Sequence, residues 1–162
     1  MHAEDVLKYG DKTFLETLAK FPNDKLEVPN ACGVWSVKDI VAHLASHEQV
    51  LVEVLRGLTG ADDKTPYMDE MAKGSEEFNV AEVEKRKSRS FDEVLSEYKD
   101  AHEKTIELLR EIPEDKRREN DTLPWYGMQY DLEDFLVYGY YGHKREHSTH
   151  IAAFQDVLAR GG

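Results

Sequence analysis

Residues 138–151 read YGYYGHKREHSTHI, and they form the middle of a segment in which apolar residues recur every three to four positions. This spacing is typical of an α-helix that packs one face against a core. Asp131 stands at the expected N-cap, and the helix should extend to about Leu158. Two histidines replace apolar side chains on the inward face, which we expect to comprise Leu132, Leu136, Gly139, His143, His147, Ile151, Phe154 and Leu158.

Three earlier segments show the same helical spacing. The first covers residues 6–21 and ends before a proline. The second begins after Ser36 and runs to about residue 58, and the third begins after Ser90 and runs to about residue 112. An acidic residue follows each serine three positions later, which is typical of a capping box at the start of a helix.

These segments predict an all-α fold, a four-helix bundle that forms a single domain over residues 1–162. No strand pattern competes with this interpretation. The connection over residues 59–89 contains glycines and a proline, so we expect mostly loop there, with a short helix that could begin near Asn79. Its role stays open, although connections of this length usually have a function.

The composition excludes several classes of partner. The chain has 33 acidic and 21 basic residues, and its net charge of -12 repels phosphate backbones and anionic membranes. The first residues lack a secretory signal, and no stretch is long and apolar enough to span a bilayer. Cys32 is the one cysteine, so no internal disulfide can form. We expect a cytoplasmic protein that binds neither nucleic acid nor membranes.

His143 and His147 are four positions apart on the last predicted helix, so their rings can offer nitrogens to one cation. From this pair alone, a structural role and a ligand role both stay open. Gly139 and Gly142 favour the ligand role, because glycine inside a helix costs about 1 kcal/mol and is usually kept where another group approaches closely.

The second predicted helix offers a third ligand. His43 and His47 are one turn apart beside its apolar stripe, and the residues alone do not choose between them. The one that does not bind, together with His150, could support the ligands through hydrogen bonds or serve as an alternative ligand.

The remaining polar candidates are expected at the surface. His2 is terminal, and we expect His102 to be exposed on the third helix. Glu48 and Glu146 lie near the histidines, but in so acidic a chain a solvated position is favoured for both. Three neutral imidazoles would then leave coordination positions open, as catalytic metal sites do.

Two motifs resemble the DinB-like superfamily. Residues 32–44, CGVWSVKDIVAHL, resemble its Trp-Ser-x-Lys-Asp-x-x-x-His-Leu start of helix two, and His143-x-x-x-His147 resembles its helix-four motif. The resemblance implies that His43, His143 and His147 are the ligands, while His47 and His150 match no family ligand. It also implies an up-up-down-down bundle with a metal site at one end, and frequent homodimers. The pair Phe78-Asn79 is similar to the ClbS/DfsB branch.

Activities in this superfamily include metal-dependent transfer of low-molecular-weight thiols and maleylpyruvate isomerisation, and the ClbS branch is associated with hydrolysis of a strained cyclopropane in a DNA-damaging metabolite. A shared scaffold does not choose among these reactions. We expect a small metalloenzyme in which Zn²⁺, Ni²⁺, Fe²⁺ or Mn²⁺ activates water toward an electrophilic small molecule. The alternatives are a metal-dependent thiol transferase and a non-catalytic bundle that sequesters a ligand.

The aromatic residues Trp125, Tyr126 and Tyr140 could line the substrate pocket, although core packing is the simpler interpretation of each one. Cys32 has no evident base beside it in the sequence and is expected to be incidental. No residue other than the ligands is assigned a catalytic role, and the sequence does not name the substrate.

Overall fold

The computed structural model describes residues 2–61 and 64–161, and within these ranges the chain is helical and contains no β-strand. One isolated bridge pairs Cys32 with Trp35. None of the helices in these ranges combines the length and apolar character that a membrane crossing requires. The predicted all-α class is therefore confirmed.

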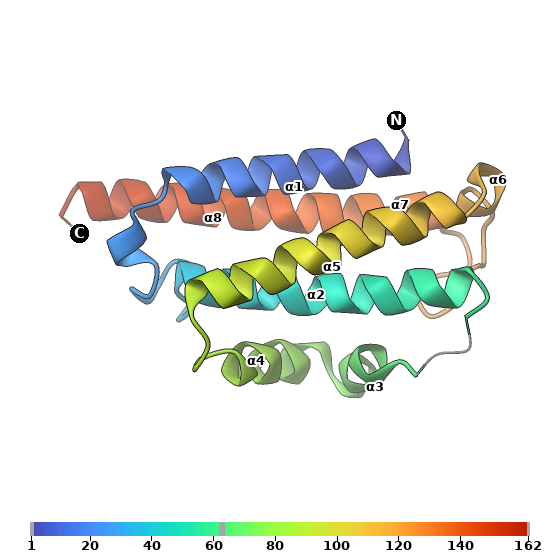
Figure 1. Cartoon of the computed structure of the whole chain (residues 1–162), viewed down its shortest axis with the longest axis horizontal. Helices are drawn as coiled ribbons and strands as arrows, with labels where there is room; N and C mark the ends of the chain where they lie inside the picture. The colour runs from blue at the N-terminus through green and yellow to red at the C-terminus, as the bar shows by residue number, and fades with distance from the viewer. Residues whose placement is uncertain (1, 62–63, 162) are drawn as a thin grey trace.

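The longest helical segments lie side by side (Figure 1). They are α1 (Ala3–Lys20), α2 (Val37–Leu58), α5 (Phe91–Glu111) and a final segment formed by α7 (Leu132–Leu136), η2 (Val137–Tyr141) and α8 (Gly142–Ala159). Shorter helices occupy the connections, namely η1 (Asn23–Lys25), α3 (Pro66–Lys73), α4 (Ser75–Lys85) and α6 (Glu114–Arg117).

Contacts between distant residues establish the directions of these segments. Phe21 stacks on Phe154 with ring centroids 6.1 Å apart, so α1 and α8 end side by side. Lys38 Nζ donates to the carbonyl of Lys87 at 3.1 Å, so α2 and α5 start side by side. Figure 1 shows α1 and α8 running opposite to α2 and α5. The order is up-down-down-up rather than the expected up-up-down-down, because the chain turns back directly after α1.

The helix starts follow the predicted caps. Ser36 Oγ accepts from the backbone N–H of Asp39 at 3.1 Å, and Asp39 Oδ2 accepts from the Ser36 N–H at 3.0 Å, which completes a capping box. Ser90 Oγ accepts from Glu93 N–H at 3.1 Å. Asp131 forms a second reciprocal box with the residue three positions later. Each cap of this kind contributes about 1 kcal/mol and sets where the helix begins.

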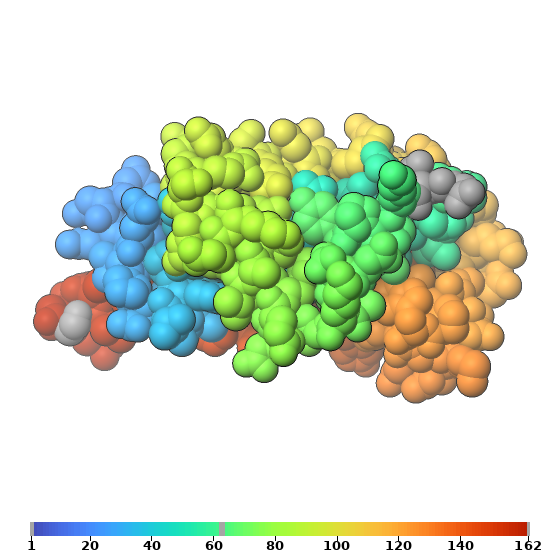
Figure 2. All heavy atoms as spheres, turned by 90° about the horizontal axis from the view of Figure 1, so that it is seen from below, coloured from blue at the N-terminus to red at the C-terminus, as the bar shows by residue number. Residues whose placement is uncertain are grey.

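The connection between α2 and α5 is more helical than the sequence predicted, since α3 and α4 occupy most of it. The carboxylate of Glu53, on α2, accepts from the N–H groups of Tyr67 and Met68 at 2.9 and 2.8 Å and so caps the start of α3. The capping residue lies on another helix, so the sequence around the start of α3 does not reveal it. Figure 2 shows α3 and α4, in green, across the middle of one face.

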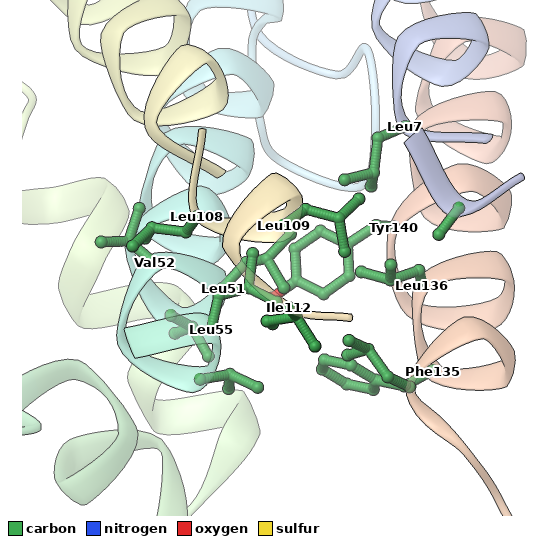
Figure 3. Close-up of a cluster of buried hydrophobic side chains, with 14 of the residues drawn as sticks. Leu7, Leu51, Val52, Leu55, Leu108, Leu109, Ile112, Phe135, Leu136 and Tyr140 are labelled. Atoms are coloured by element: carbon green, nitrogen blue, oxygen red, sulfur yellow. The ribbon is translucent and has the colours of Figure 1, made fainter. Parts of the chain in front are cut away.

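The core contains two clusters of buried apolar residues. The cluster in Figure 3 lies beside α7 and joins α1, α2, α5 and the final segment through Leu7, Leu55, Leu109, Leu136 and Tyr140, among others. The second cluster surrounds the first half of α2 and includes Phe14, Val41, Tyr98, Ile151 and Phe154. Each fully buried leucine contributes about 1.5–3 kcal/mol to the free energy of folding, so both halves of the helical array are anchored.

A π-helical turn, η2, interrupts the final segment just before the histidines. The N–H of Gly142 donates to the carbonyl of Val137, five positions back, and a Cβ at Gly142 would lie 3.3 Å from that oxygen. A Cβ at Gly139 would meet only its own helix. The expected approach of another group to these two glycines is therefore wrong. The close contact between helices lies instead at Gly10, whose Cβ position is 3.4 Å from Tyr141 Cα.

Candidate metal centre

The side chains of His43, His143 and His147 meet between α2 and α8. The Nε2 atom of His143 lies 2.9 Å from Nε2 of His43 and 3.0 Å from Nε2 of His147. One donor atom from each ring lies within 4.8 Å of the other two, and within the described ranges no other His, Cys, Asp or Glu atom joins this group. The structure thus brings together the three histidines that the family resemblance implied as ligands.

The contacts of His143 suit a shared cation better than hydrogen bonds alone. A ring nitrogen carries either one hydrogen or one lone pair, so Nε2 of His143 cannot make good hydrogen bonds to both neighbours. A cation accepts a lone pair from every ring. Tetrahedral ligands that are each about 2.1 Å from an ion are about 3.4 Å apart. The two separations from His143 are within about 0.5 Å of that spacing, and the three donors lie within 4.8 Å of one another, so these residues fit a metal ion.

The outer nitrogens of two rings are also informative. Nδ1 of His43 and Nδ1 of His147 are buried, and neither has a hydrogen-bond partner among the described residues. Histidines that bind metals usually donate this N–H to a carbonyl, a carboxylate or water. No protein acceptor therefore fixes the tautomer of these rings, whereas a cation on Nε2 would place the proton on Nδ1.

Burial keeps the three rings neutral. Removal from water, followed in importance by the neighbouring histidines, lowers the pKa of His43 from the ordinary 6.5 to about 2. The same causes lower the pKa of His143 to about 3 and that of His147 to about 4. The neutral form is the one that binds metals. At neutral pH each ring therefore already has a lone pair on one nitrogen and need not first lose the extra proton of a charged imidazolium.

His47 lies beside the three rings but is directed toward α4. Its Nε2 pairs with Oδ1 of Asn79 at 2.9 Å, and its ring meets Phe78 edge to face. Its centroid is 4.6 Å from that of His43 and 5.1 Å from that of His143. His47 therefore joins α4 to the histidine cluster. The structure thus gives His43 and His47 different contacts, a distinction that the residues alone could not make.

Trp35 forms a wall of the cluster that the sequence reasoning missed. Its ring centroid lies 4.9 Å from that of His43, and both Trp35 and His143 are half-buried. The available signal was the position of Trp35 directly before the N-cap Ser36, which places it about two helical turns before His43. These two half-buried residues therefore mark the edge of the cluster that is nearest to solvent.

Comparison with models of protein families shows which family the chain belongs to. The model of the DinB superfamily matches residues 7–151, which include all three histidines. The chain belongs to the DinB superfamily. Comparison with curated proteins gave no match, and comparison with solved structures gave none either. The DinB superfamily is metal-binding, in agreement with the geometry of the cluster.

A second group of donors lies next to the first in this DinB chain. Donor atoms of Cys32, His147 and His150 all lie within 4.8 Å of one another. Burial, and after it the charge of Glu146, raise the pKa of the Cys32 thiol, so the free thiol is protonated at neutral pH. Glu146 itself is exposed, as expected.

The predicted pocket aromatics are divided by the fold. Tyr140 is buried, and its hydroxyl donates to the carbonyl of His47 at 2.9 Å, so it supports the helix that carries His43. The ring contacts described for Trp125 and Tyr126 are with each other and with aromatic residues at the α7 end, and none is with a histidine. The structure does not bring these two residues to the DinB histidines.

A buried polar network was not foreseen. Glu48 is fully buried rather than solvated, and it forms an ion pair with Lys144, which is 2% exposed. His102, expected at the surface, is 7% exposed, and its Nδ1 lies 3.7 Å from Glu48 Oε2. Neither carboxylate oxygen of Glu48 receives a hydrogen bond of standard geometry from the described residues. The terminal His2 is exposed, as predicted, and pairs with Glu114.

Proposed function

We propose that this DinB protein is a metal-dependent enzyme that hydrolyses an electrophilic small molecule, with His43, His143 and His147 as the protein ligands of a divalent cation. The proposal includes a single four-helix-bundle domain over residues 1–162 and membership of the ClbS/DfsB branch. It also includes a cytoplasmic location and a homodimer.

One observation carries the proposal. Three imidazole nitrogens from α2 and α8 converge, and no fourth protein donor completes their group in the part of the chain that the structure describes. A structural metal site is usually closed by four protein ligands, whereas a catalytic site keeps positions for water or substrate. Three ligands therefore favour a catalytic site.

The cation would supply Lewis acidity and a bound water of lowered pKa, which is the source of the nucleophile in metal-dependent hydrolysis. The residues of the chain supply the rest. His43, His143 and His147 hold the ion in their neutral forms, and Trp35 covers one side of His43 and limits the access of bulk water. Tyr140 and Asn79 hold the neighbouring turn of α2 in place.

The branch assignment is supported by the surroundings of His47. Phe78 and Asn79 form the pair that is similar to the ClbS/DfsB branch, and both contact His47, beside the proposed ligands. Because α4 brings this pair to the cluster, the long connection between α2 and α5 has a role in the site. Replacing Asn79 by Leu should therefore change turnover more than stability.

Metal content tests the first half of the proposal. The purified protein, dialysed without chelator, should hold at least one divalent ion per chain, and elemental analysis should show whether it is Zn, Ni, Fe or Mn. His143→Ala should lose that ion. His2→Ala removes an exposed histidine and should keep it. Loss of the ion in both variants, or in neither, would contradict the ligand assignment.

Product analysis tests the second half. The loaded protein is incubated with a panel of strained or activated electrophiles, with and without a low-molecular-weight thiol. Repeated formation of a water adduct supports a hydrolase. A thiol adduct that requires the added thiol would show the transferase alternative instead, and at most one event per chain would show a sequestering protein.

A further inference from the structure

The donors beside the proposed metal ligands form a group of their own. Cys32 lies in the loop before α2, and His147 and His150 lie on α8, with their donor atoms within 4.8 Å of one another. We propose that Cys32, His147 and His150 form a second cation position, adjacent to the first and sharing His147 with it. This inference rests on the proposed function only through the shared ring.

His147 is built to serve both positions. Its Nε2 faces the Nε2 of His143 at 3.0 Å and so belongs to the first group. Its Nδ1 is buried without a partner among the described residues, in a side chain that is 5% exposed. A buried ring nitrogen without a partner is unfavourable, because it has lost its hydrogen bond to water. A cation bound at this second nitrogen would satisfy it.

His150 shows the same lack of a partner. Its Nδ1 is buried and, within the described ranges, receives and donates no hydrogen bond. The rings of His147 and His150 are 5.5 Å apart at an angle of 60°. Two imidazole rings, each with one nitrogen that has no partner among the described residues, therefore lie beside one thiol, and this donor set binds zinc and other borderline or soft cations.

The loop holds Cys32 at this place through backbone hydrogen bonds. The N–H of Trp35 donates to the Cys32 carbonyl at 2.9 Å, and the N–H of Cys32 donates to the Trp35 carbonyl at 3.2 Å. Gly33, with φ of 57°, allows the tight turn between them. The same turn therefore places the indole against His43 and the thiol beside His147.

The chemistry of loading is balanced by proton release. A cation at the second position displaces the proton of the Cys32 thiol, because the thiolate is the form that binds metals. With both positions filled, His147 would hold one ion at each ring nitrogen and would therefore also release its remaining ring proton. Both protons pass to the solvent, and no oxidant or reductant takes part.

Cobalt titration tests the second position. Metal-free full-length protein is titrated with Co²⁺, and a thiolate-to-cobalt charge-transfer band in the near ultraviolet reports binding by Cys32. The wild-type protein should take up two equivalents and show the band. Cys32→Ser and His150→Ala should each bind one equivalent without the band, and His2→Ala should behave as wild type. Circular dichroism checks that every variant is folded.

The titration separates this inference from the proposed function. Uptake of one equivalent without the band, lost in His43→Ala, would refute the second position and leave the first in place. Uptake of two equivalents that both persist, with the band, in His43→Ala would support the second position and refute the proposed ligand set. A band that survives in His150→Ala would overturn the assignment of His150.

Discussion

Lys144 and Glu48 form an ion pair in the interior. We expect that replacing one partner alone destabilises the protein much more than replacing both partners by apolar residues. Their side chains are 2% and 1% exposed, and Lys144 Nζ lies 2.5 Å from Glu48 Oε1. Close to them lie the ring of His102 and the hydroxyl-bearing ring of Tyr98. A single change, Lys144→Met, leaves a carboxylate in this interior with no cation in contact.

The magnitude follows from the geometry. At 2.5 Å and an effective dielectric constant of about 20, the two charges attract each other by about 6–7 kcal/mol. The cost of removing both from water offsets most of this attraction, whereas removal of one partner alone costs about 3–5 kcal/mol. Lys144→Met and Glu48→Leu should each lower the free energy of unfolding by that amount. The double variant Lys144→Met with Glu48→Leu should stay within about 2 kcal/mol of wild type.

Urea unfolding followed by circular dichroism, at neutral pH with chelator present, measures these differences. The double-mutant cycle should give a coupling energy of several kcal/mol. Lys104→Met is the control, because Lys104 pairs with Glu107 at the surface and its loss should cost less than about 1 kcal/mol. Single variants that lose less than about 1 kcal/mol, or a double variant whose loss equals the sum of the singles, would refute the reasoning.

Two further predictions concern other parts of the fold. Burial raises the pKa of Glu97, but hydrogen bonds from the Arg86 guanidinium lower it by more, so the net pKa lies below the ordinary 4.5. The Glu97 carboxylate therefore stabilises the fold above about pH 4.5, and this stabilisation is lost as the pH falls through the lowered pKa. The stability difference between wild type and Glu97→Gln should shrink on acidification, and a difference that stays constant from pH 7 to 3 would contradict this. Gly57→Ala, in an open position of α2, should raise the free energy of unfolding by about 0.5–1 kcal/mol. Gly10→Val should lower it by about 1–3 kcal/mol, because its side chain would press on Tyr141; equal thermal shifts for the two glycine variants would disprove this contrast.

Much of the helical structure was predictable because its signals are local. Ser36 and Asp131 start their helices as the capping rules require, and apolar spacing identified the long segments. Helix α3 and the start of α4 at Ser75 were missed, and only a short helix near Asn79 was foreseen, because the support of these helices is not local. Glu53 caps α3 from another helix, and Phe78 of α4 is buried against the core. No pattern within residues 59–89 reports such contacts.

The candidate site divides in the same way. The spacing of His143 and His147 is a property of one helix, so the sequence alone showed that the two rings could chelate one cation but left a structural role open. The choice of His43 over His47 needed a family resemblance, and its position beside His143 needed the packing of α2 against α8. Trp35 and the second donor group at Cys32 lie outside any helix periodicity, which is why they were missed or set aside.

The sequence by itself therefore determined where the long helices begin, which faces they bury and which residue types could bind a cation. The tertiary structure decided the directions of the helices, the burial of Glu48 and His102, and the meeting of donors from α2, α8 and the loop at Cys32. The physical reason is range: caps and helical spacing act over a few residues, whereas burial and ligand convergence depend on which segments pack together.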